Sequence, residues 1–185
     1  PVFLYQKLME LKEERMVLVT TAPLTNIALL LKTFPDATEK IDKIVLMGGA
    51  VVGGNITSTA EFNIWEDPEA AQIVFSSGVP IVMCGLDVTY KCGFNRTEIQ
   101  ELLRGEEKAR AFGEMLDFYF HTEVYTEKQR VAIHDAVPFM YLIHPEIFTA
   151  QEMNVCVDCS EGQNRGMTIC DTRSWSDAPK NALVL

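Results

Sequence analysis

The sequence predicts an α/β fold with a mostly parallel sheet flanked by helices. Three short apolar runs have the pattern of strands that are buried on both faces, and they alternate with helical stretches: Met16–Thr20, Lys43–Met47 and Pro80–Cys84. Such alternation favours a parallel sheet that is covered on both faces. Hydrophobic residues make up 48% of the 185 residues and charged residues 23%, which is typical of a globular protein with a real core.

Helices are expected before and between these strands. Residues 3–14 place apolar side chains at helical intervals, and another helix should follow the first strand and run through Lys32. The clearest helix begins at Asp67, whose side chain can cap free amide groups, and Pro68 fits its first position. Gly78 is expected to end this helix.

The second half of the chain predicts further helices and then short strands. The expected helices cover Thr97–Leu103, residues 107–128 and residues 134–144, where Pro145 ends the last one. Short strands separated by polar turns are expected at Met153–Asp158, Gly166–Cys170 and Asn181–Leu185. The chain begins at Pro1 and its last strand has no closing turn. We therefore expect residues 1–185 to form a single domain that is incomplete at both ends.

Composition limits the partners and the compartment. The net charge of −10 repels phosphate backbones and anionic lipid, so neither a nucleic acid nor a membrane is an expected partner. No stretch of these residues has the charged start and apolar run of a signal peptide, and no run is long enough to span a bilayer. With an odd number of cysteines, we expect the reducing cytoplasm. Cys156 and Cys159 form a C-x-x-C pair. Without a second pair at zinc-binding spacing, they are more typical of buried hydrophobic residues than of a metal or redox site.

A polar segment after the second strand suggests sugar binding. The glycines within Met47–Asn55 match neither a dinucleotide-binding nor a Walker phosphate loop. In an extended segment, Glu61 and Asn63 would point to the same side, with Phe62 between them. Together with Asn55 they could satisfy the hydroxyls of a sugar ring. The alternative is that these side chains only hold the turns of their own backbone.

A second candidate site is the pair His134 and Asp135 at a junction between a loop and a helix. An imidazole can pass a proton to a leaving group, and the adjacent carboxylate can ligate a hard cation such as calcium. The alternative is that Asp135 merely caps the helix.

Taken together, seven segments resemble the signatures of the inosine-uridine nucleoside hydrolases. They follow one another in the same order as in that family: Val19–Ala28, Val45–Ala50, Gly54–Asn55, Ala60–Ile64, Asp67–Ala71, Gly85–Thr89 and Ile133–Ala136. The resemblance extends from about Met16 to Leu185. It implies a nucleoside hydrolase-like, Rossmann-like domain.

The resemblance also implies a role for each matching residue. The backbone oxygen of Thr21 and the carboxylate of Asp135 would bind a calcium ion (Ca2+), and His134 would face the departing base. The residues that would contact the ribose are Met47, Asn55, Glu61, Phe62, Asn63 and Asp135. Of these, the polar ones would hold hydroxyls, while the methionine and the phenylalanine would wall the pocket.

The implied reaction is hydrolysis of the N-glycosidic bond of a ribonucleoside to ribose and free base. A calcium-activated water would attack through an oxocarbenium-like transition state, which nearby carboxylates would favour. The family's aspartate-rich motif, D-x-D-x-G-x-D-D, supplies the general base and most calcium ligands, and these residues do not contain it. Two protein oxygens fall short of the roughly six to eight that calcium takes, so we expect this piece alone to be inactive.

Two alternatives to an enzyme of purine or pyrimidine salvage are kept open. One is a nucleoside- or sugar-binding protein without hydrolytic activity, and the other is a scaffold whose polar loops serve only assembly. The preferred base is not determined by the sequence. Tyr125 is a candidate base contact, although an aromatic residue at helical spacing is more often core. A homo-oligomer, dimer or tetramer, is expected.

Overall fold

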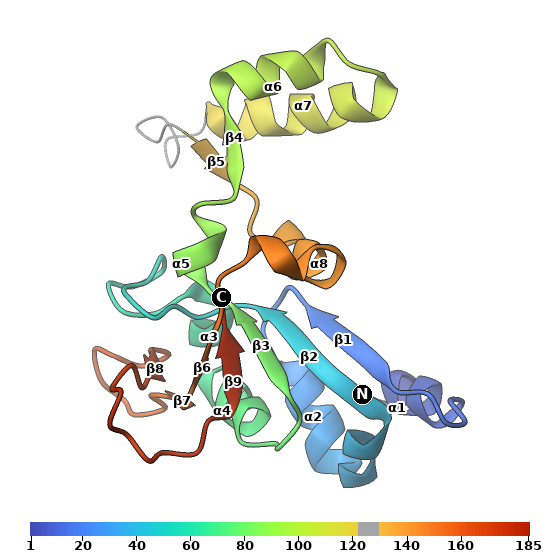
Figure 1. Ribbon diagram of the computed structural model, residues 1–185, viewed down its shortest axis with the longest axis vertical. Helices are drawn as coiled ribbons and strands as arrows, with labels where there is room; N and C mark the ends of the chain where they lie inside the picture. The colour runs from blue at the N-terminus through green and yellow to red at the C-terminus, as the bar shows by residue number, and fades with distance from the viewer. Residues whose placement is uncertain (122–129) are drawn as a thin grey trace. The chain divides into compact units, whose positions relative to one another are not determined.

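The computed structural model in Figure 1 describes residues 1–121 and 130–185. The chain divides into two compact units, of which the first contains Pro1–Val88 and Asp135–Leu185, and the second Thr89–His134. Each unit has its own core and is described by itself. That residues 1–185 form one domain stays a prediction.

The first unit is built on a five-stranded sheet. Its strands lie in the order β1 (Met16–Thr20), β2 (Ile41–Met47), β3 (Ile81–Cys84), β9 (Ala182–Val184) and β6 (Gln151–Met153). The first four are parallel to their neighbours, and only β6 runs antiparallel, against β9 (Figure 1). The predicted α/β class with a mostly parallel sheet is therefore confirmed.

Helices precede, connect and follow these strands. The helices of the first unit are α1 (Val2–Met9), α2 (Thr25–Thr33), η1 (Pro35–Lys40), α3 (Phe62–Glu66), α4 (Pro68–Phe75), α5 (Leu86–Thr89), α8 (Ala136–Ile143) and η2 (Pro145–Ile147). The last residue of α5, Thr89, belongs to the second unit. Helices α2 and α4 pack against each other, and α8 packs against β2. The first helix is shorter than expected because the polar residues 12–15 give it no apolar face to bury.

The predicted start of α4 is confirmed, and the helix ends slightly earlier than expected. Asp67 Oδ1 accepts a hydrogen bond from the backbone N–H of Ala70 at 3.1 Å, and Pro68 occupies the first helical position. The helix ends at Phe75, and Gly78 then turns the chain with a φ of 79°, which glycine adopts without strain.

The C-terminal region contains a separate antiparallel hairpin, in which β7 (Val155–Val157) pairs with β8 (Thr168–Cys170). The strand predicted from Met153 to Asp158 is therefore divided between β6 and β7, which belong to different sheets. Asn154 separates them. The cysteines of this region, Cys156, Cys159 and Cys170, are free thiols and are only partly buried.

The second unit combines a short hairpin with two helices. Strand β4 (Gly93–Asn95) pairs with β5 (Arg130–Ala132), and α6 (Arg96–Leu103) packs against α7 (Glu107–Phe120). The small core of this unit is formed by Ile99, Leu116 and Val131. The two strands were not predicted from the sequence. The expected extension of α7 to residue 128 and the candidate Tyr125 lie outside the described residues.

The core of the first unit lies between the sheet and its helices. All four residues of β3 and the last four of β2 are buried, as their apolar sequences predicted. Leu30 of α2 and Met83 of β3 are completely buried. Across residues 1–121 and 130–185, we find no helix with the length and apolar character needed to cross a membrane.

Two adjacent leucines in α2 test this packing. Leu30 is 0% exposed and Leu29 is 48% exposed. Replacing Leu30 by Ala should lower the free energy of unfolding by about 2–5 kcal/mol, because a buried side chain leaves a cavity. The matched Leu29→Ala variant should change it by about 0.5 kcal/mol or less. Chemical denaturation of both variants measures this, and equal losses would contradict the described packing.

Candidate active site at the carboxyl ends of the strands

The predicted site residues of the first unit follow strands of the parallel sheet or lie in the connections between them. Thr21 comes directly after β1, and Met47 is the last residue of β2. In open parallel sheets, ligands bind beyond the carboxyl ends of the strands. The glycine-rich loop of residues 48–54 and helix α3 follow β2 at this edge.

Glu61 is the most enclosed polar residue of this region, with 3% of its surface exposed. Its carboxylate accepts three backbone hydrogen bonds, from Gly49 at 2.9 Å, Asn63 at 3.0 Å and Ile64 at 3.3 Å. Two of these donors belong to the first turn of α3, so Glu61 is the cap of this helix. The third donor ties the glycine-rich loop to the helix.

Burial raises the pKa of the Glu61 carboxyl above its ordinary value, because desolvation disfavours the charged form. The hydrogen bonds from the three backbone N–H groups oppose this shift and lower the pKa. The negative charge of Asp135 adds to the rise. Asp135, 74 residues later in the sequence, is thus within electrostatic reach of Glu61.

Asn63 is fixed by the end of β2. Its Nδ2 donates to the backbone carbonyl of Met47 at 3.1 Å and contacts Met47 Sδ at 3.3 Å. Asn63 is 9% exposed and Met47 is 4% exposed. This orientation leaves the amide oxygen of Asn63 as the atom that can accept a hydrogen bond from a ligand.

Asn55 lies at the outer side of the same segment. Its Oδ1 accepts a hydrogen bond from the backbone N–H of Phe62 at 2.9 Å, which leaves its amide N–H groups to donate. The preceding Gly54 is required here, because a Cβ atom at this position would overlap the backbone of Ala60. Phe62 is 45% exposed and presents an aromatic surface.

One geometric expectation for this segment was wrong. Glu61 and Asn63 were expected to point to one side of an extended segment, but Phe62–Glu66 is helical. The local gain from capping a helix explains the difference, since a buried carboxylate that accepts N–H groups stabilises a helical turn. The alternative that these side chains hold their own backbone is therefore observed. It leaves polar atoms of Asn55 and Asn63 for a ligand.

His134 and Asp135 lie on opposite sides of the boundary between the two units. In the second unit, His134 Nδ1 is 2.7 Å from the hydroxyl oxygen of the fully buried Thr89, and the ring of Tyr90 meets the imidazole edge-on. In the first unit, Asp135 precedes α8, but its side chain makes no capping hydrogen bond. A capping hydrogen bond by Asp135 is thus not seen, and the residue is exposed.

The two residues predicted to bind a hard cation, Thr21 and Asp135, carry oxygen donors. Asp135 offers carboxylate oxygens and Thr21 a backbone carbonyl, which are the donor types that calcium prefers. The neighbouring Thr20 has a buried hydroxyl oxygen without a hydrogen-bond partner in the described part of the chain. Within that part, no three His, Cys, Asp or Glu side chains are grouped to hold a metal. The donor chemistry fits calcium, while the number of donors is incomplete.

Asp87 has a role that the sequence analysis did not assign. Its carboxylate accepts hydrogen bonds from the backbone N–H groups of Val51 at 2.6 Å and Val52 at 3.3 Å. It therefore anchors the glycine-rich loop to α5. Its sequence signals were its place in Gly85–Thr89, one of the seven segments that resemble the family, and its position in the first turn of a short helix.

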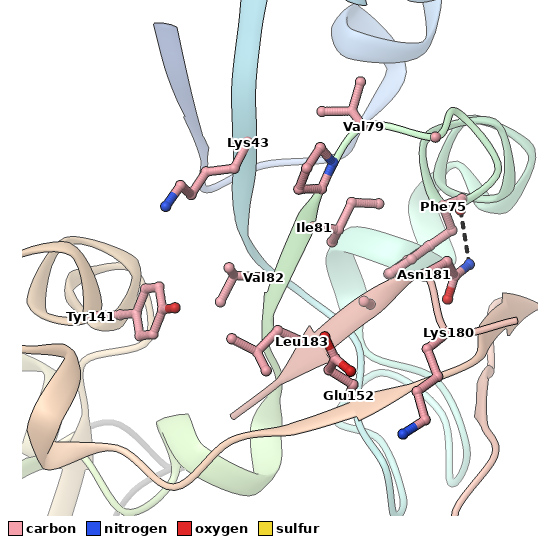
Figure 2. Close-up of a pocket in the computed structure, with 13 residues that line it drawn as sticks. Lys43, Phe75, Val79, Ile81, Val82, Tyr141, Glu152, Lys180, Asn181 and Leu183 are labelled. Carbon is pink, nitrogen blue, oxygen red and sulfur yellow. Dashed lines mark hydrogen bonds between the residues drawn. The ribbon is translucent and has the colours of Figure 1, made fainter. Parts of the chain in front are cut away.

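A groove of about 480 Å³ lies elsewhere on the first unit (Figure 2). It is lined by residues at or near the amino ends of β3 and β9, including Ile81 and Leu183, together with Lys43 and Tyr141. Asn181 closes one side by donating to the carbonyl of Phe75 at 2.8 Å (Figure 2). None of the predicted site residues lines this groove, so it is separate from the candidate active site.

The chain resembles known proteins over nearly all of its length. Residues 2–185 match the family model of the inosine-uridine preferring nucleoside hydrolases. The chain is 40% identical to the pyrimidine-specific ribonucleoside hydrolase RihA of Photobacterium profundum, over 98% of this chain and 60% of that protein. It is 42% identical to the RihA of Shewanella oneidensis, over 91% of this chain and 54% of the relative. The chain thus spans between one half and two thirds of the length of these relatives.

A solved structure of a ribonucleoside hydrolase also resembles this chain. The purine-preferring ribonucleoside hydrolase from Gardnerella vaginalis superposes with a TM-score of 0.85 at 35% identity. The match covers 99% of this chain and 58% of that chain.

The buried Glu61 predicts how stability depends on pH. Because its pKa is raised in the folded protein, the folded state binds this proton more tightly than the unfolded state. The contribution of Glu61 to the free energy of unfolding should therefore be greatest below the ordinary pKa and fall as the pH rises through the raised pKa. Denaturation at several pH values measures this. The Glu61→Gln variant should lack this decline, and an identical pH profile would contradict the assignment.

Proposed function

The chain belongs to the inosine-uridine preferring nucleoside hydrolase family, and on this premise we propose that the whole protein hydrolyses the N-glycosidic bond of ribonucleosides to ribose and free base. The observation that carries the proposal is the placement of Glu61 and Asn63 beyond β2, within electrostatic reach of Asp135. This arrangement supplies donors, acceptors and negative charge within one region of the first unit.

The ribose would be held by the polar atoms that the backbone leaves available. The amide group of Asn55 can donate, and the amide oxygen of Asn63 can accept, to neighbouring hydroxyls. Glu61 has remaining acceptor capacity, because a carboxylate can accept about four hydrogen bonds and three are used within the protein. Met47 and Phe62 would enclose the sugar ring.

Bond cleavage would develop positive charge on the sugar. As the bond to the base lengthens, an oxocarbenium-like transition state forms, and a water molecule adds to the anomeric carbon. The carboxylates of Glu61 and Asp135 would stabilise this charge more than they stabilise the neutral substrate. The water oxygen ends on ribose, and the departing base gains a proton.

Calcium is the cofactor that we propose. The carbonyl oxygen of Thr21 and the carboxylate of Asp135 would bind it, with the remaining ligands supplied by residues other than the described ones. A bound ion supplies positive charge that favours ionisation of the attacking water. The hard oxygen donors support this choice of metal over a softer one.

On the base side, we assign His134 as the proton donor to the leaving group. The hydrogen bond between its Nδ1 and Thr89 fixes the ring, so that Nε2 is the nitrogen that would serve the base. We also propose that pyrimidine ribonucleosides are preferred, because the two curated relatives at 40% and 42% identity are named pyrimidine-specific. The solved relative at 35% identity is named purine-preferring.

The proposal is tested by measuring ribose released from uridine, cytidine and inosine by the whole protein, with and without a chelator. Release that favours the pyrimidines and stops with the chelator is the expected result. Nucleoside binding without release of ribose would instead favour the alternative of a nucleoside-binding protein. Cytoplasmic location, assembly as a dimer or tetramer, and the absence of nucleic-acid or membrane partners stay predictions.

Replacing Asp135 by Ala should lower turnover by roughly 100-fold or more, because one change removes both a metal ligand and a sugar contact. Steady-state hydrolysis of uridine measures the loss. Asp177→Ala is the matched control, since Asp177 is an exposed aspartate in the C-terminal region. Retained activity in the Asp135 variant would overturn the assignment.

Replacing His134 by Ala should slow hydrolysis of natural nucleosides more than that of p-nitrophenyl riboside. The nitrophenolate is a good leaving group and needs no proton, whereas a departing base does. Rates on both substrates are compared for the variant and the wild type. An equal loss on the two substrates would remove His134 from the role of proton donor.

A further inference from the structure

Two side chains of β8 contact the glycine-rich loop: Thr168, and more weakly Cys170, whose Sγ lies 3.9 Å from the carbonyl oxygen of Ala50. Thr168 is 3% exposed. Its hydroxyl oxygen accepts a hydrogen bond from the backbone N–H of Ala50 at 2.9 Å and donates to the carbonyl of the same residue at 2.6 Å. A hydroxyl has one donor and two acceptor lone pairs, so both bonds can form together. Thr168 and Ala50 are 118 positions apart in the sequence.

Ala50 directly follows Gly49, the loop residue that is hydrogen-bonded to Glu61. The N–H of Gly49 donates to Glu61, while Ala50 is bound by Thr168. Packing is close here as well, because a Cβ atom on Gly49 would come within 2.9 Å of the Thr168 methyl carbon. Thr168 thus connects to the proposed sugar-binding carboxylate through two consecutive residues of the loop.

We propose that Thr168 is a positioning residue for the sugar pocket. Its hydroxyl fixes Ala50 on both its N–H and its C=O, which holds Gly49 where it can donate to Glu61. The inference rests on the proposed function, because the pocket is assigned to ribose there. Thr168 itself acts through the loop and is not assigned a contact with the substrate.

The hydroxyl, and not the bulk of the side chain, is what this role requires. Valine has nearly the same shape as threonine but cannot hydrogen-bond. Thr168→Val would therefore leave the N–H of Ala50 unpaired and its C=O with only the weak contact from Cys170 Sγ at 3.9 Å. The loop would then shift to reach water. Serine keeps the hydroxyl and loses only a methyl group. Asp87 still holds residues 51 and 52, so the loop should loosen around Gly49 and Ala50 without unfolding.

The test compares three variants of the whole protein, Thr168→Val, Thr168→Ser and Val157→Ala. Val157 is a buried residue of the same hairpin, so its truncation destabilises the hairpin without removing the hydroxyl. Two quantities are measured. One is amide hydrogen exchange in residues 48–52, which requires no substrate, and the other is kcat/KM for uridine.

Thr168→Val should exchange faster in residues 48–52 and lose roughly tenfold in kcat/KM, as expected when a buried polar group loses its partner. Thr168→Ser should restore both quantities to near the wild-type values. Val157→Ala should lower the melting temperature while leaving kcat/KM of the folded protein unchanged.

The outcomes separate this inference from the proposed function. Unchanged exchange in Thr168→Val would overturn the anchoring role, and faster exchange with unchanged kcat/KM would overturn the positioning role. A loss in Val157→Ala equal to that in Thr168→Val would reduce Thr168 to a general structural residue. If the wild type releases no ribose, the proposed function fails, and exchange alone then decides whether Thr168 anchors the loop.

Discussion

The candidate site depends on the burial of one carboxylate. Glu61 cannot remain in an apolar environment unless hydrogen-bond donors surround it, and three backbone N–H groups do so. Those donors come from the start of α3 and from Gly49, so satisfying Glu61 fixes the helix and the glycine-rich loop together. Even with these hydrogen bonds, desolvation raises the pKa of the Glu61 carboxyl. In the proposed reaction, a carboxylate held in this way would be preorganised to meet a developing positive charge.

Three side chains from different parts of the sequence hold the glycine-rich loop by hydrogen bonds. Glu61 binds it from the helix that follows, Asp87 from α5, and Thr168 from the C-terminal hairpin. Each uses side-chain oxygens to satisfy backbone groups that no strand pairs. A loop held in this way can approach a ligand closely, as glycine allows, and still keep one conformation.

The imidazole of His134 is held within the second unit. Residues assigned to the sugar and the cation belong to the first unit, whereas His134 is the last residue of the second. Its hydrogen-bond partner Thr89 is the first residue of the same unit. This hydrogen bond therefore connects the first and last residues of the second unit and also orients the imidazole.

The sequence by itself determined the fold class, the buried strands of the parallel sheet and the start of α4, because these follow from local hydrophobic pattern and capping. It also named Glu61, Asn63 and Asp135, whose joint role at a sugar stays a prediction. Only the tertiary structure decided that Glu61 caps a helix, that Asp87 and Thr168 hold the loop, and that β4 pairs with β5. The same residues can form a helix cap or an extended segment, so the sequence does not decide between them. Hydrogen bonds between residues 36 or 118 positions apart leave no periodic pattern in the sequence.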